Sequence, residues 1–139
     1  MSAATSRRAD WLMRLGELTA QRLDQPFAWG ERDCCLWAAD AVQAVTGVDP
    51  ATGLRGTYAT AYGAARVLHE QGGLAALCER HLGAEILPAQ AQVGDVGLVD
   101  EGPSGALVVC LGLHWMGQRE RGLGPVMTDK VLRAWRCHG

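Results

Sequence analysis

The sequence predicts an α+β domain, with helices in the N-terminal half and antiparallel strands in the C-terminal half. Between residue 9 and about residue 81, apolar side chains recur every three or four residues, as in amphipathic helices. After Gly83, short apolar runs alternate with turn-forming segments such as 101–105, which is typical of antiparallel strands. We expect one domain over residues 1–139, in which residues 1–8 are disordered or form an extended arm.

Each predicted element is bounded by residues that begin or end regular structure. Thr57 is the expected N-cap of the third helix, and the glycine pair 72–73 ends that helix. The pattern predicts helices over 9–22, 34–46, 58–71 and 74–81, and extended segments over 86–87, 96–100, 106–113, 114–118, 123–127 and 131–137. Because the run 106–113 is almost continuously apolar, we expect it to be a central strand covered on both faces.

The composition is that of an ordinary globular protein and excludes several functional classes. Hydrophobic residues make up 48% of the chain and charged residues 20%, with a net charge of -2. This charge, without a basic patch, gives no basis for binding nucleic acid. No stretch approaches the roughly 20 apolar residues of a membrane span. Residues 1–10 lack the apolar run of a signal peptide, so we expect synthesis in a reducing cytoplasm.

The cysteines do not form the pattern of a disulfide or zinc framework. There are five of them, an odd number, at positions 34, 35, 78, 110 and 137, without a Cys-x-x-Cys pair. Cys78 and Cys110 stand among apolar neighbours and are expected in the core. We therefore expect no metal and no cofactor. A metal site built from Cys34, Cys35, Cys137 and His138 is an alternative with poor ligand spacing.

The most informative stretch is residues 27–45, which contains a cysteine at the start of a predicted buried helix. Asp33 is the expected N-cap, because its carboxylate can accept hydrogen bonds from the first-turn N–H groups. Cys34 follows in the first turn, ahead of an apolar stripe formed by Trp37, Ala38, Ala41 and Val45. The free N–H groups and the helix dipole at this end are expected to favour the reactive thiolate of Cys34.

Several motifs together resemble a known family. The aromatic lead-in Phe27-Ala28-Trp29-Gly30 followed by Asp33-Cys34 resembles the nucleophile segment of the NlpC/P60 family of papain-like cysteine peptidases. The chain is most similar to small phage tail proteins of that superfamily, also at Ala39-Asp40, Arg55-Gly56-Thr57-Tyr58, Val93-Gly94-Asp95-Val96 and Leu132-Arg133-Ala134-Trp135-Arg136. Cys35 and Leu36 replace the Ser-Gly of the peptidase signature. The resemblance implies an NlpC/P60-like fold, with N-terminal helices packed on a small C-terminal antiparallel sheet or partial barrel.

A cysteine nucleophile requires a base within hydrogen-bond reach, and this sequence lacks one at the expected place. In the peptidases that it resembles, the base is a histidine at the start of the strand that follows the Gly-Asp strand. Here that position falls at about Ala106, and no histidine lies between His81 and His114. His114 follows at the far end of the same strand, roughly 26 Å of extended chain from Ala106.

Two functions follow from the resemblance. The preferred hypothesis is a structural or assembly protein of a phage tail, near the tail tip, with an inactive site. It would be made in the host cytoplasm, reside in the virion and contact other tail-tip or hub proteins, with peptidoglycan as a further contact. The alternative is an active cysteine peptidase or amidase that cleaves peptidoglycan stem peptides during DNA entry.

The candidate site residues follow from the same motifs. Cys34 occupies the nucleophile position, and Asp33, Trp29, Tyr58 and Arg55 are candidates to line the site. Arg55 and Tyr58 also have a structural interpretation, as a loop anchor and a half-buried aromatic. For protein contacts, the segment 114–117 and the glycine-rich loop 121–125 are candidate surfaces, because Trp and Met are enriched at interfaces.

Overall fold

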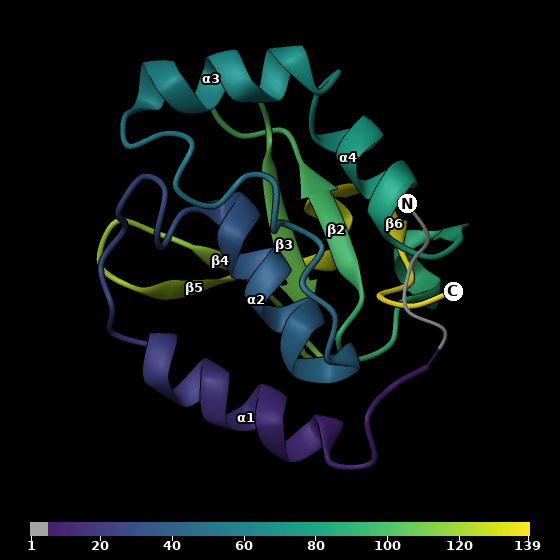
Figure 1. The fold of residues 1–139 in the computed structure, drawn as a ribbon. Coiled ribbons are helices and arrows are strands. Elements are labelled where there is room, and N and C mark those ends of the chain that lie inside the picture. The colour runs from purple at the N-terminus through teal and green to yellow at the C-terminus, as the bar shows by residue number, and fades with distance from the viewer. Residues whose placement is uncertain (1–5) are drawn as a thin grey trace.

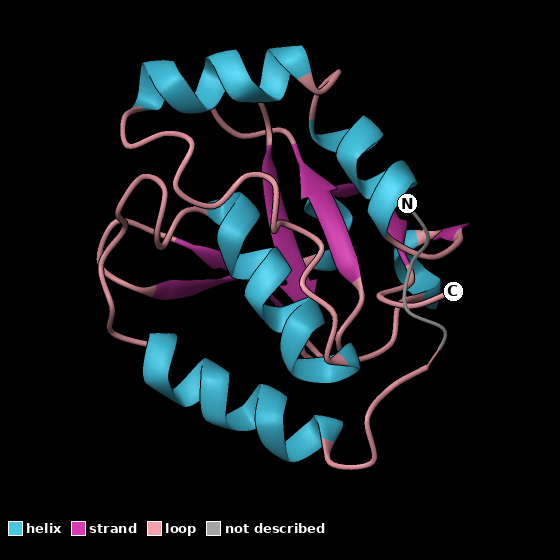
Figure 2. Ribbon diagram, viewed as in Figure 1, coloured by secondary structure: helices cyan, strands magenta, loops and turns pink. Residues whose placement is uncertain are grey.

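The computed structural model describes residues 6–139 and shows four helices followed by one antiparallel sheet (Figure 1). The helices are α1 (Trp11–Arg22), α2 (Cys34–Thr46), α3 (Ala61–Glu70) and α4 (Leu74–His81). The strands are β1 (Glu85–Ile86), β2 (Val96–Val99), β3 (Ala106–Cys110), β4 (Trp115–Gln118), β5 (Leu123–Val126) and β6 (Val131–Trp135). The predicted α+β class is confirmed, and Figure 2 shows the helices in front of and around the strands.

The sheet has six strands in the order β1-β6-β2-β3-β4-β5, and every neighbouring pair is antiparallel. The last strand, β6, is therefore inserted between β1 and β2. β3 lies inside the sheet, as its apolar sequence predicted, but it ends at Cys110. The predicted extension to residue 113 is wrong, because Gly112 has a φ of 106° and turns the chain toward β4.

The main core forms where α2 packs against one face of the sheet. The predicted stripe of Trp37, Ala38, Ala41 and Val45 is buried in this core. From the strands, Leu107 and Val109 join the same cluster. The indole Nε1 of Trp37 donates a hydrogen bond to the Met116 carbonyl at 2.9 Å, which ties α2 to β4. α1 packs against α2 and runs below it in Figure 1, while α2 lies in front of the sheet.

A second, smaller core lies on the other face of the sheet. Its buried members all come from strands: Val99, Val108, Cys110, Trp115, Val126, Val131 and Ala134. Within the described residues, this cluster is therefore formed without a buried residue from α1–α4. Trp115 is 1% exposed and its indole Nε1 donates to the Thr128 hydroxyl at 3.2 Å. The interpretation of segment 114–117 as a contact surface is therefore wrong for Trp115.

Two helix starts differ from the sequence prediction. α1 begins at Trp11 and not at residue 9. α3 begins at Ala61 with Thr60 as its N-cap, whose hydroxyl accepts from the Gly63 N–H at 3.0 Å. Thr57, the predicted cap, instead donates its hydroxyl to the Leu54 carbonyl at 2.6 Å. The sequence contains both threonines, and the loop contacts decide which of them caps the helix.

The N-terminal segment makes specific contacts from its first described residues onward. Residues 1–5 of the predicted disordered or extended arm lie outside the described part of the chain. The Arg8 N–H donates to the Val45 carbonyl at 2.8 Å, at the end of α2. The Arg7 guanidinium donates to the Val93 carbonyl at 3.0 Å and lies 4.4 Å from the Trp11 ring centroid. These contacts hold residues 7 and 8 against the domain.

The second core makes a clear prediction for Gly97→Ala. A Cβ at position 97 would lie 2.7 Å from the Trp115 ring and 2.8 Å from a Val131 methyl group. We expect this overpacking to lower the free energy of unfolding by about 1–3 kcal/mol in urea denaturation. Gly16→Ala is the control, because nothing lies within 4 Å of its added Cβ on α1. That change should stabilise the protein by up to about 1 kcal/mol, and equal effects of the two substitutions would contradict the packing argument.

Candidate functional site

The site is built around the carboxylate of Asp33 at the start of α2. Asp33 is 2% exposed and accepts three hydrogen bonds. The Leu36 N–H donates at 2.9 Å, the Gly30 N–H at 3.0 Å and the Tyr58 hydroxyl at 2.6 Å. The predicted N-cap role is confirmed by the Leu36 contact. The other two contacts join the preceding turn and the distant segment around residue 58 to the helix start, and the N-cap pattern did not predict them.

Tyr58 acts as a hydrogen-bond donor in this network. Burial, together with the hydrogen bond to Asp33, raises the pKa of its phenol above the ordinary value of tyrosine. The carbonyl oxygen of Tyr58 also lies where a side chain on Gly30 would be, 2.2 Å from an added Cβ. Gly30, with a φ of 81°, therefore permits the close approach of the two segments.

Cys34 follows Asp33 in the first turn of α2 and is the one half-buried cysteine, since the other four are buried. Burial raises the pKa of its thiol to about 11, and the nearby Asp33 carboxylate adds to this effect. The Leu107 backbone beside the thiol acts in the opposite direction and lowers this pKa. The expectation that the helix start favours a thiolate is thus wrong, because desolvation outweighs the N–H groups of the first turn.

The residue of β3 that meets Cys34 is Leu107. Its backbone influences the pKa of the thiol, and its side chain belongs to the core beneath α2. Ala106 packs against the second core on the opposite face, because successive residues of a strand point to opposite sides. The predicted base position is therefore displaced by one residue, from Ala106 to Leu107. Neither side chain can accept a proton.

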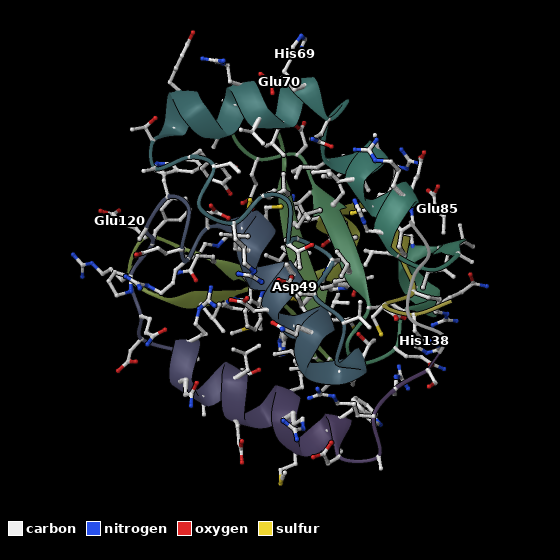
Figure 3. All side chains as sticks on the ribbon, viewed as in Figure 1. Asp49, His69, Glu70, Glu85, Glu120 and His138 are labelled. Atoms are coloured by element: carbon white, nitrogen blue, oxygen red, sulfur yellow. The ribbon has the colours of Figure 1, made fainter. Side chains whose placement is uncertain are left out.

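The histidines lie elsewhere in the described structure. His69 projects outward from α3, and His138 lies beside the C-terminus (Figure 3). His114 is exposed in the turn after β3, at the strand end opposite to Leu107. His81 is at the end of α4, where burial lowers the pKa of its imidazole. None of the four perturbs the pKa of Cys34.

Arg55, a predicted lining residue, anchors the loop that follows α2. Its guanidinium donates to Asp49 at 2.7 Å and to Asp40 at 2.6 Å. The other oxygen of Asp40 accepts from Arg22, which is 5% exposed at the end of α1. Asp40 thus joins α1, α2 and the loop after α2. Partial burial raises the pKa of Asp49, but the hydrogen bonds and the charge of Arg55 outweigh it, so that the pKa is lowered. The structural interpretation of Arg55 as a loop anchor is confirmed.

The remaining candidate, Trp29, lies at the surface of the turn that precedes Asp33. It is 40% exposed, and its ring meets Phe27 edge-on at a centroid distance of 4.6 Å. The turn that carries Trp29 and Asp33 thus meets the segment around Tyr58 at Gly30. The arrangement gives Cys34 two polar neighbours, the Asp33 carboxylate and the Tyr58 phenol, and no histidine beside it within residues 6–139.

Asp95, from the Gly-Asp motif, has a structural role. It is 0% exposed and accepts hydrogen bonds from the Gln92 N–H at 2.8 Å and the Cys137 N–H at 3.1 Å. Arg136 donates to the same carboxylate at 2.8 Å. The carboxylate thus caps the turn before β2, and it also fixes the residues after β6 next to the start of β2.

An apolar cavity of about 40 Å³ lies between α2, α4 and the loop after α2. Cys35 and Cys78 contribute their thiols to its wall, and Leu107 forms part of its floor. Burial raises the pKa of Cys78 to about 12 and the pKa of Cys35 further still, so both thiols are neutral at physiological pH. This cavity is part of the core behind Cys34.

The alternative metal site finds no support in the described residues. Cys34 and Cys35 begin α2, whereas Cys137 and His138 follow β6. Within residues 6–139, no three His, Cys, Asp or Glu side chains come together in a way that could hold a metal ion. In the same part of the chain, no helix combines the length and apolarity that a membrane crossing requires.

Comparison with known proteins identifies the family of this chain. Residues 6–137 match the family model described as Domain of unknown function (DUF6950), and the chain belongs to this family. A search of the curated proteins finds no match. This family description names no activity.

The raised pKa of Cys34 predicts slow alkylation near neutral pH. The iodoacetamide labelling rate of the folded protein should be low at neutral pH, increase steadily with pH and level off only above about pH 11, because the thiolate is the reacting form. Mass spectrometry of the peptide that contains Cys34 measures this rate, and Cys34→Ala identifies labelling of Cys35 in the same peptide. An apparent pKa below the free value of about 8.5 would contradict the desolvated thiol.

The ion-pair network predicts that Asp40→Ala is strongly destabilising. Arg22 would keep its charge in a nearly buried position without its carboxylate partner. We expect a loss of about 3 kcal/mol in the free energy of unfolding, measured by urea denaturation. The control is Asp10→Ala, which breaks the exposed pair with Arg14 and should cost less than about 0.5 kcal/mol. Similar losses in both variants would show that burial of Arg22 does not matter.

Proposed function

We propose that this chain is a structural or assembly component of a phage tail, near the tail tip, with an NlpC/P60-like fold whose nucleophile position is inactive. The observation that carries the proposal is that β3 packs against α2 and presents Leu107 beside Cys34, where an enzyme would need a proton acceptor. With a pKa of about 11, roughly one thiol in ten thousand is ionised at pH 7. Cys34 thus occupies a nucleophile position, but its thiol is not activated to the thiolate.

The positions that carry the family resemblance support a structural role for the motif. Asp33, Gly30 and Tyr58 form one hydrogen-bonded network, and Arg55 anchors the loop that leads to Tyr58. Asp95 holds the C-terminal residues. Each of these residues has a contact that stabilises the fold, so the motif is compatible with a protein that catalyses no reaction. The protein would then be made in the host cytoplasm and act in the virion through contacts with other tail-tip or hub proteins.

The alternative is an active cysteine peptidase or amidase that acts on peptidoglycan stem peptides. One observation favours it: Cys34 is the least buried of the five thiols and stands at a helix start, facing a strand. Contact with peptidoglycan is expected mainly if this enzymatic alternative holds, because peptidoglycan would be its substrate. Activity would require a base supplied by the substrate complex or by a partner protein.

A Cys34→Ala allele in the phage that encodes this chain separates the two functions. If the chain is structural, the variant should incorporate into gradient-purified particles and keep the plaque titre within about threefold, because no step uses the thiol. The purified wild-type protein should release no fragments from peptidoglycan stem peptides, measured by mass spectrometry.

Cys78→Ala is the control for the loss of a buried thiol, because Cys78 lies in the core behind the site. A titre that collapses in Cys34→Ala but not in Cys78→Ala, with both proteins folded, would establish the enzymatic alternative. Absence of the wild-type chain from purified particles would refute a role in the virion.

A further inference from the structure

A β-bulge in β6 points an apolar side chain into solvent. Leu98 of β2 faces Arg133, whereas the next residue, Val99, faces Val131, so Leu132 has no partner in the register. Its side chain is 60% exposed. Bulges redirect side chains and occur preferentially near functional sites. The exposure of Leu132 is therefore a consequence of backbone geometry and not of a frayed strand end.

Leu132 borders a groove that collects further apolar side chains. The groove has a volume of about 470 Å³, and its apolar residues come from β2, β5, β6 and the turn after β5: Val99, Pro125, Val126, Met127 and Leu132. Met127 is 58% exposed, and Pro125 is exposed as well. We call this surface the bulge groove. Because its exposed apolar groups converge from separate segments, it is a contiguous patch and not a set of scattered residues.

The rim of the bulge groove carries unbalanced negative charge. Glu101 is neutralised by Arg119, which reaches both of its carboxylate oxygens. Asp100 and Asp129 also line the groove, and within residues 6–139 neither forms an ion pair. Lys130 is the one further cation of the lining. Two carboxylates and one ammonium group thus leave a net negative rim around an apolar floor.

The groove is independent of the Cys34 site. Val99 and Val126 belong to the second core, on the face of the sheet opposite to α2. α2, which carries Cys34, lies in front of the sheet in Figure 1. A contact at the groove would therefore leave the environment of Cys34 unchanged.

We propose that the bulge groove is the surface that binds a neighbouring tail protein, through a segment whose apolar side chains are bordered by lysine or arginine. This inference rests on the proposed function and names the contact through which it operates. The apolar floor supplies buried area, and the carboxylates Asp100 and Asp129 select a cationic partner by charge complementarity.

The test compares two exposed leucines in the phage that encodes this chain. Leu132→Glu places a charge in the groove, and Leu113→Glu places the same charge on a leucine that is 88% exposed in the turn after β3. Mass spectrometry of gradient-purified particles measures the ratio of each variant to the major tail protein. We expect Leu113→Glu to match the wild type and Leu132→Glu to fall at least about tenfold, and thermal melts of the purified proteins should show both variants folded.

A second variant tests the chemistry of the partner. Asp100→Lys combined with Asp129→Lys reverses the rim charge without touching the apolar floor, and it should also reduce incorporation at least about tenfold. Incorporation of Leu132→Glu at the wild-type ratio would overturn the groove as the contact. Normal incorporation of the charge-reversed variant alone would overturn the cationic partner. Absence of the wild-type chain from the particles would instead refute the proposed function, and the inference with it.

Discussion

The buried carboxylate of Asp33 is the interaction on which the N-terminal half of the structure depends. It accepts from a turn, a helix and a residue 25 positions away, so one side chain fixes three segments. A carboxylate without water around it is stable only when donors surround it, and the three donors meet that requirement. The same arrangement positions Cys34, because the residue after the cap necessarily enters the first turn of α2, beside Leu107 of β3.

The chemistry of Cys34 results from a balance between burial and hydrogen bonding. The helix start and the Leu107 backbone favour the thiolate, whereas desolvation and the adjacent Asp33 favour the neutral thiol, and the neutral thiol is the stable form. The carboxylate that builds the site therefore also suppresses its nucleophile. A neutral thiol at the nucleophile position is compatible with the proposed structural role.

The two faces of the sheet carry two separate cores. α2 covers one face beside the cysteine site, whereas the core on the other face is formed by strand residues around Trp115. A bulge can occur in β6 without damage to the main core because Leu132 belongs to neither cluster. In the proposed tail protein, the nucleophile region maintains the fold and the bulge groove makes the contacts.

The sequence by itself determined the α+β class, the bounds of α2 and α4, the Asp33 cap and the stripe of α2, because these follow from local periodicity and capping. Only the tertiary structure decided which threonine caps α3, that Leu107 and not Ala106 faces Cys34, and that Trp115 is buried. It also decided the bulge at Leu132. These features depend on strand register and on desolvation, which arise from contacts between residues far apart in the chain and leave no local pattern.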